Sequence, residues 1–136
     1  MTMPILGVND VMAVAELRAA LRQFLRRSER VARQSGLTPQ RYLLLLMIKG
    51  APGGSEQSTV TELSERLQLA QSTVTELVRR AEEAGLVERE QSRTDARVAH
   101  LRLTAEGERR LMLSFTELET ERAQLRAAFA QLDSTG

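Results

Sequence analysis

The segment 59–103 constrains the fold most, because two short helical patterns and two strand-like runs follow one another in it without a long gap. "TVTELSERL" (59–67) and "QSTVTELVRRAEEA" (71–84) each carry apolar residues at three- and four-residue spacing, which predicts two amphipathic helices. Three residues separate the two patterns, and Gly85 ends the second. A short helix, a tight turn and a second helix are the spacing of a helix-turn-helix.

Two short strands are predicted directly after this unit. "LVERE" and "VAHLRL" are joined by the polar segment 91–97, which is typical of a β-hairpin. A helix-turn-helix followed by a hairpin is a winged helix. Its second helix, about 71–84, suits a DNA major groove, and its hairpin, the wing at about 87–103, can reach the neighbouring backbone or minor groove.

Long helices are predicted on both sides, at 10–35 and 108–133, with Asn9 or Asp10 as the first N-cap and Thr104 as the N-cap of the last helical stretch. Heptad-spaced apolar stripes run along both. The first comprises Val14, Leu17, Leu21, Phe24, Ser28 and Val31, and the second runs from Leu111 to Leu132. Such stripes would leave exposed apolar patches, which mark interfaces, so mutual packing in a homodimer is favoured over one long coiled coil.

The predicted fold is therefore mainly α with a small β-hairpin. Residues 1–136 form a single domain with a winged helix-turn-helix lobe at 37–107 and a helical dimerisation lobe made by the N- and C-terminal helices. At the start of the winged lobe, "LTPQRYLLLLMIKG" predicts a buried helix with Thr38 as N-cap and Pro39 at the first helical position. The following "APGGSEQS" is a loop.

Candidate DNA contacts follow from the second helix of the helix-turn-helix. If its apolar residues face inward, steps of 100° per residue turn Ser72, Glu76 and Arg79 outward. Gln71, Thr73 and Thr75 lie at its start and flanks, where hydroxyl and amide groups suit phosphates and base edges. Glu76 either accepts from a cytosine amino group or turns away. The alternative for the whole face is an ordinary solvated helix surface.

The hairpin tip, "SRTDAR" (92–97), contains no large apolar residue. Arg93, Thr94 and Arg97 are candidate DNA contacts there, and Asp95 is close enough in sequence to pair with Arg97. A narrow A·T-rich minor groove has a strongly negative potential that attracts arginine. The alternative is a surface ion pair without function, worth about 0–1 kcal/mol.

Three motifs together resemble the MarR family of winged-helix regulators. They are "LTPQRYLLLLMIKG", "TVTELSERLQLAQSTVTELVRRAEEAGLVERE" and "TDARVAHLRLTAEG", and they cover 37–107. Asp95-Ala96-Arg97 ahead of "LTAEG" is similar to that family's wing signature. The resemblance implies that Arg97 enters the minor groove and that Asp95 pairs with it. Two departures are Ala70, where a serine-type N-cap is usual, and Arg79, where many relatives have aspartate.

The resemblance also implies partners. They are a second copy of the chain, double-stranded DNA with a pseudo-palindromic operator, and a small aromatic or anionic effector that releases DNA from a repressor. Tyr42 is a candidate for lining an effector pocket, although core packing is the other interpretation. A different class of function stays open, namely a dimeric winged-helix module that binds protein instead of DNA. The net charge of +1 favours that alternative, since phosphate binding normally needs a positive field.

Several functions are disfavoured by what the sequence lacks. It has no cysteine for disulfides, thiolate metal sites or redox sensing, and its single histidine, His100, has no metal-ligating residue beside it. No nucleophile or phosphate-loop motif is present, so no catalytic residue, cofactor or metal is predicted. The first ten residues do not form a signal peptide, and the longest apolar run, 42–48, is far short of the roughly 20 residues that span a bilayer. A cytoplasmic protein without membrane contact is expected.

Overall fold

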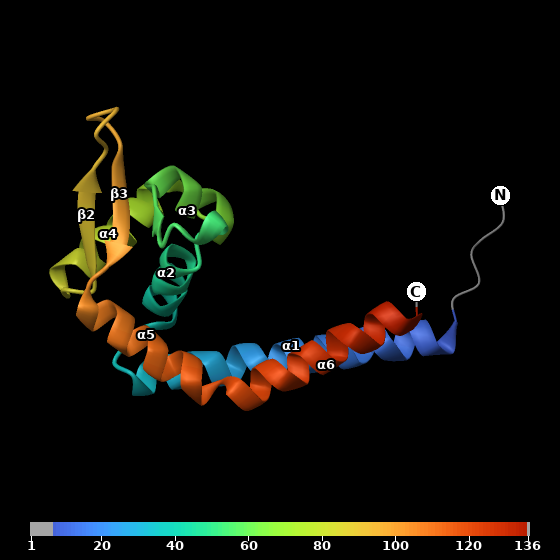
Figure 1. The fold of residues 1–136 in the computed structure, drawn as a ribbon. Helices are drawn as coiled ribbons and strands as arrows, with labels where there is room; N and C mark the ends of the chain where they lie inside the picture. Colours follow the sequence, from blue (N-terminus) through green and yellow to red (C-terminus); the bar gives the residue numbers. More distant parts are fainter. Residues whose placement is uncertain (1–6, 136) are drawn as a thin grey trace, which may run out of the picture. The chain divides into compact units, whose positions relative to one another are not determined.

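The structure is a computed structural model and describes residues 7–135 (Figure 1). The residues on which the absence of a signal peptide was predicted lie partly outside this range, at 1–6. Within it the elements follow the order α1 (Val8–Gln34), α2 (Pro39–Lys49), the 3-10 turn η1 (Pro52–Gly54), β1 (Gln57–Ser58), α3 (Val60–Leu67), α4 (Gln71–Glu83), β2 (Val87–Gln91), β3 (Ala99–Leu103), α5 (Ala105–Glu117) and α6 (Glu119–Thr135).

The chain divides into two compact units, which are described separately. The helical unit contains the residues up to Val31 and those from Phe115 onward, and the winged unit contains Ala32–Ser114. Across residues 7–135 no helix is both long enough and apolar enough to cross a membrane.

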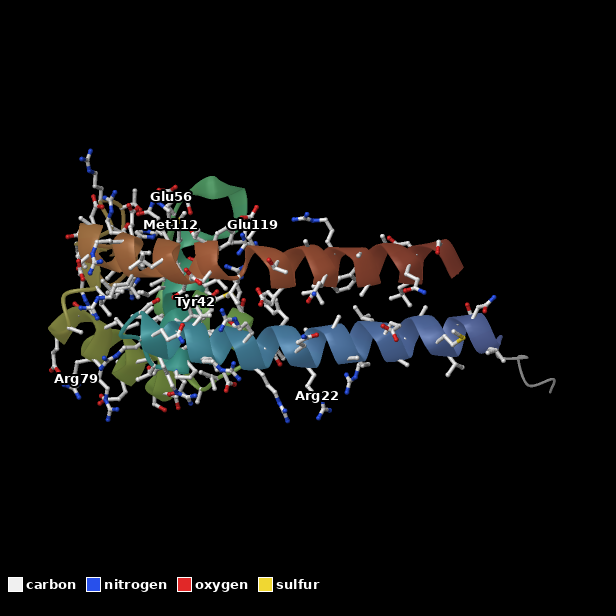
Figure 2. All side chains as sticks on the ribbon, turned by 90° about the horizontal axis from the view of Figure 1, so that it is seen from below. Arg22, Tyr42, Glu56, Arg79, Met112 and Glu119 are labelled. Carbon is white, nitrogen blue, oxygen red and sulfur yellow. The ribbon has the colours of Figure 1, made fainter. Side chains whose placement is uncertain are left out.

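In the helical unit, α1 and α6 run antiparallel and side by side (Figures 1 and 2). Arg27 Nε lies 3.4 Å from Glu121 Oε1 in an ion pair between them. Helix α1 begins at Val8, two residues before the predicted start at 10. The carbonyl of Gly7 accepts hydrogen bonds from the amides of Asp10 and Val11, so the first turn closes before the predicted N-cap.

The apolar stripe of α1 is only partly buried within the single chain. Val31 of the stripe is fully buried, whereas Val14 is 47% exposed and its neighbour Ala13, outside the stripe, is fully buried. Large apolar side chains are exposed on each of the long helices. These are Val8, Val11, Met12, Val14 and Leu25 on α1, Met112, Leu113 and Phe115 on α5, and Phe129 on α6. The single chain therefore leaves much of the predicted apolar surface uncovered.

The C-terminal helical stretch is broken into α5 and α6 at Leu118. The amide of Leu118 donates to the carbonyl of Phe115 at 3.2 Å, and the carbonyl of Leu118 then accepts from the amide of Arg122 at 2.9 Å. At the other end, Thr104 Oγ1 accepts from the amide of Gly107 at 3.1 Å, which confirms Thr104 as the N-cap. The first helical residue is thus Ala105, directly after the predicted cap, as the sequence indicates.

The winged unit is built around α2, which packs against α3, α4 and β3. Leu44, Leu45 and Ile48 are fully buried there, as the apolar run predicts. Thr38 Oγ1 accepts from the amide of Arg41 at 3.1 Å, so the predicted N-cap of this helix is confirmed.

A three-stranded antiparallel sheet in the order β1-β3-β2 completes the winged unit. Val87 pairs with Leu103 and Gln91 with Ala99, so the hairpin is in continuous register up to its tip. Strand β1 was not predicted, because "APGGSEQS" was interpreted as loop throughout. Its residue Ser58 pairs with Leu101 and is buried, which brings the end of that loop into the sheet.

Candidate nucleic-acid interface

Helix α3 and the turn after it are held by local hydrogen bonds. Thr59 and Glu62 form a capping box in which each side chain accepts from the other's amide, both at 3.2 Å. Ser64 Oγ donates to the carbonyl of Leu69 at 2.6 Å, and Gln68 ends the helix in the left-handed region at φ 58°. These bonds fix the direction in which the chain enters α4.

Helix α4 begins at Gln71, although Ala70 offers no side-chain cap. It therefore starts where predicted. Its inward face consists of Val74, Leu77, Val78 and Ala81, all buried, as the 100° steps indicate. The predicted contact residues on this helix are all exposed. They are Gln71, Ser72, Thr73, Thr75 and Arg79.

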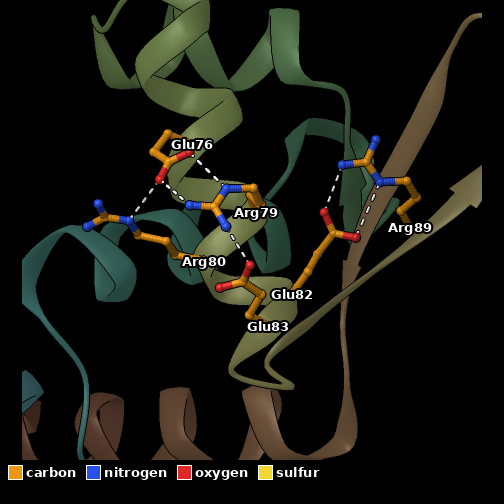
Figure 3. A network of polar contacts seen from close by, with 6 residues as sticks. All are labelled: Glu76, Arg79, Arg80, Glu82, Glu83 and Arg89. Carbon is orange, nitrogen blue, oxygen red and sulfur yellow. Dashed lines mark hydrogen bonds and ion pairs between the residues drawn. The ribbon is translucent and has the colours of Figure 1, made fainter.

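The exposed face of α4 also carries a network of ion pairs (Figure 3). Arg79 bonds both carboxylate oxygens of Glu76, with Nε 2.9 Å from Oε2, and it is also paired with Glu83. Arg80 Nε donates to Glu76 Oε1 at 3.0 Å. Arg79, predicted as a positive group facing DNA, is therefore already bonded to two glutamates of its own helix.

These contacts affect the protonation of the network. Hydrogen bonds from Arg79, and then from Arg80, lower the pKa of Glu76 to about 2. The bond to Glu76 raises the pKa of Arg79 above its ordinary value. A further pair joins α4 to the sheet, where Arg89 Nη2 lies 2.7 Å from Glu82 Oε1, and this hydrogen bond raises the pKa of Arg89. Glu76, Arg79 and Arg89 therefore stay charged at neutral pH.

The wing tip is ordered by short-range hydrogen bonds. Ser92 Oγ accepts from the amides of Thr94 and Asp95 at 3.2 and 3.3 Å. Asp95 Oδ1 accepts from the amide of Arg97 at 3.0 Å and from its Nε at 3.3 Å. The side chain of Arg97 is nevertheless 91% exposed, so its guanidinium is held at the base and projects into solvent. Arg93 is exposed as well.

Two grooves bring the predicted residues together with others. One groove, of about 260 Å³, lies between the start of α3 and the wing. Its polar lining residues are Thr59, Thr61, Arg89 and Arg97. The other, of about 380 Å³, lies between α2 and α4 and is lined by Gln40, Ser72, Thr73, Glu76, Leu77 and Arg80. Hydroxyl, amide and guanidinium donors of this kind bind phosphate oxygens and base edges.

Sequence reasoning missed part of this surface. Arg80 and Glu83 were not singled out, although their spacing of four residues from Glu76 and Arg79 predicts the pairs that form. Arg89 was missed for another reason, since its partner Glu82 lies on a different element. Among residues 7–135, no group of three or more metal-ligating side chains comes together.

A buried α2, a helix-turn-helix formed by α3 and α4, and a hairpin formed by β2 and β3 define a winged helix-turn-helix protein (Figure 1). This is the predicted fold class. A family model described as MarR family matches residues 35–98, which is the segment that holds these elements. Residues 35–98 therefore belong to the MarR family, as the resemblance predicted.

Solved structures agree with this assignment. The chain is 29% identical to the Mycobacterium tuberculosis transcriptional regulator MosR, solved in complex with DNA, over 81% of this chain and 77% of that one, with a TM-score of 0.60. AbsC, a MarR family transcriptional regulator from Streptomyces coelicolor, is 22% identical over 96% and 84%, with a TM-score of 0.63. A mutant of Escherichia coli MarR complexed with operator DNA is 20% identical over 79% and 74%, with a TM-score of 0.65.

A comparison of the sequence with curated proteins finds no significant match. The family match nevertheless places the winged segment with transcriptional regulators and not with enzymes, as predicted.

Proposed function

We propose that this regulator binds double-stranded DNA sequence-specifically as a homodimer and represses transcription from a pseudo-palindromic operator. The observation that carries the proposal is the exposed row of hydroxyl and amide groups on α4 next to a wing whose Arg97 side chain is 91% exposed. The DNA-bound structures of MosR and of E. coli MarR, which share this fold, support the same partner.

In this proposal α4 enters the major groove and the wing tip follows the adjacent minor groove. Gln71, Ser72, Thr73 and Thr75 contact bases or phosphates from the first turns of α4. Arg97, held by Asp95, enters the minor groove, and Arg93 and Thr94 contact phosphates. Because Asp95 already accepts hydrogen bonds from the amide and Nε of Arg97, less side-chain conformational entropy is lost when the guanidinium binds DNA.

The homodimer is supported by the apolar side chains that one chain leaves exposed on α1, α5 and α6. A second copy that packs on these helices would remove them from water. Two-fold symmetry would then present two α4 helices to successive major grooves, about 34–36 Å apart.

An anionic effector is supported by a groove on α1 within the helical unit. It has a volume of about 450 Å³ and is lined by Arg22, Arg26, Arg27, Arg30, Glu121 and the uncharged Ala19 and Gln23. Its four guanidinium groups and one carboxylate favour a small anion. In the family-based proposal, such an effector would release the protein from DNA.

The deciding experiment is selection from a pool of random duplexes at ~150 mM salt, with the unchanged protein and Arg97→Ala in parallel. We expect a palindrome with half-sites about one helical turn apart. The variant should bind more weakly and lose preference for A·T pairs beside each half-site.

The same experiment tests the other class of function. If folded protein retains no duplex, sequence-specific DNA binding by the unliganded protein is wrong. A dimeric module that binds another protein would then be the better description, and Arg97→Ala should leave the capture of that partner unchanged.

A further inference from the structure

Glu76 lies at the centre of the exposed face of α4. The buried residues Val74, Leu77, Val78 and Ala81 fix the inward direction of this helix. Steps of 100° then place Ser72, Glu76, Arg79 and Glu83 in one row on the opposite side. Glu76 follows Ser72 by one turn, so it stands in the first half of the helix, the part that reaches base edges in helix-turn-helix proteins.

The carboxylate of Glu76 keeps one acceptor position open. A carboxylate has about four lone-pair positions, two on each oxygen. Oε1 accepts from Arg79 and Arg80, whereas Oε2 accepts only from Arg79 Nε among the described residues. The two arginines hold the carboxylate in place, and Oε2 can still accept a hydrogen bond from a ligand.

Charge pairing makes this carboxylate tolerable close to DNA. An isolated carboxylate would be repelled by the phosphates. Glu76 is instead bonded to the guanidinium groups of Arg79 and Arg80. Arg79 also pairs with Glu83, so this cluster of two carboxylates and two guanidinium groups is neutral as a whole; Figure 3 draws its contacts. The orientation of the carboxylate is also restrained, because both of its oxygens accept hydrogen bonds from the guanidinium of Arg79.

The edges of the bases differ in what they offer to such an acceptor. In the major groove, cytosine presents an N4 amino donor without an acceptor beside it, whereas guanine presents only the acceptors O6 and N7. We propose that Glu76 is a specificity-determining residue, whose Oε2 accepts from a cytosine amino group in each half-site while Arg79 and Arg80 position its carboxylate. The inference rests on the proposed function, because it requires α4 to lie in the major groove.

The test compares the unchanged protein with Glu76→Gln in random-duplex selection, followed by affinity measurements on duplexes that differ at one position. Glutamine keeps the length of the side chain but presents an amide, which pairs with adenine N6 and N7. We expect the unchanged protein to select cytosine at one position per half-site, with discrimination on the order of tenfold. Glu76→Gln should lose that preference or move it to adenine, and leave all other positions as they were.

Glu65→Gln is the matched control, since Glu65 is an exposed glutamate on α3 and lies outside both grooves. It should reproduce the unchanged operator. If Glu76→Gln selects the same operator as the unchanged protein, or binds all sequences more tightly to an equal degree, Glu76 acts only through its charge and the assignment is wrong. If the unchanged protein selects no sequence, the proposed function fails, and this inference fails with it.

Discussion

Gly107 lies directly against the backbone of Leu86: a Cβ atom on Gly107 would stand 2.1 Å from the carbonyl oxygen of Leu86. That oxygen also accepts the amide of Thr104 at 3.0 Å, and Thr104 Oγ1 donates to the carbonyl of Gly85 at 2.6 Å. The glycine of "LTAEG" is therefore required by the close approach of α5 to the start of β2.

Replacing Gly107 by alanine should destabilise the protein, because the added methyl group meets backbone that cannot rotate aside. We expect a loss of about 1–3 kcal/mol in the free energy of unfolding, measured by chemical denaturation. Glu117→Ala, at an exposed position of the same helix, should change it by less than about 0.5 kcal/mol. Equal stability of the two variants would contradict the steric argument.

Asp95 and Arg97 should be coupled in DNA binding. Asp95→Ala removes the acceptor for the amide and Nε of Arg97, so affinity for the operator should fall although a negative charge has been removed. In a double-mutant cycle, Asp95→Ala should have little further effect when Arg97 is already alanine. Fluorescence anisotropy at fixed salt would measure this. Tighter binding by Asp95→Ala alone would mean that the aspartate merely repels phosphates.

Acid should weaken α5 through Glu106. Bonds from Arg109, and then from Arg110, lower the pKa of Glu106 from its ordinary 4.5 to about 2 in the folded protein. A depressed folded pKa stabilises the protein above pH 4.5, and the stabilisation is lost as the pH falls from 4.5 towards 2. The stabilities of the unchanged protein and Glu106→Gln should therefore converge over this window in denaturation curves at several pH values. Parallel curves would exclude the contribution of this carboxylate.

Self-association should depend on the exposed apolar face of α1. Met12 is 56% exposed in the single chain, and glutamate there would place a charge in the proposed dimer interface. We expect Met12→Glu to shift sedimentation towards the monomer and to lower the melting temperature. Leu43→Glu is the control, since Leu43 is similarly exposed, at 40%, but belongs to the winged unit. If the Met12→Glu protein were still dimeric, the dimer interface would not include this face of α1.

The winged unit was predictable from sequence because its local signals agree with its packing. The apolar residues of α4 are spaced as a helix with one buried side requires, and Thr38, Pro39 and Thr104 stand where helix starts need them. Strand β1 escaped prediction because only two residues pair with β3. So short a segment has no periodicity to read.

The long helices were harder to predict in detail. Val14 fits the heptad stripe of α1, yet Ala13 is the buried residue, because periodicity identifies apolar faces without saying which one packs inside the same chain. The break at Leu118 has no glycine or proline to announce it. In the site, the exposed positions of α4 could be predicted from helix geometry. Arg79 was expected to be available to DNA, whereas it is bonded to Glu76 and Glu83. These bonds depend on side-chain conformations, which the sequence pattern does not specify.

The pairing of arginines with glutamates across α4 and the sheet has a consequence for how such a regulator searches a genome. Each of four arginines here is bonded to a glutamate, namely Arg79, Arg80, Arg89 and Arg102. Through these arginines, non-specific binding to the DNA backbone would therefore release few counterions. A genome offers on the order of a million or more competing sites for such weak, non-specific binding. If the proposed function holds, a protein with few unpaired arginines would spend less time on other DNA, and a small number of copies would keep its operator occupied.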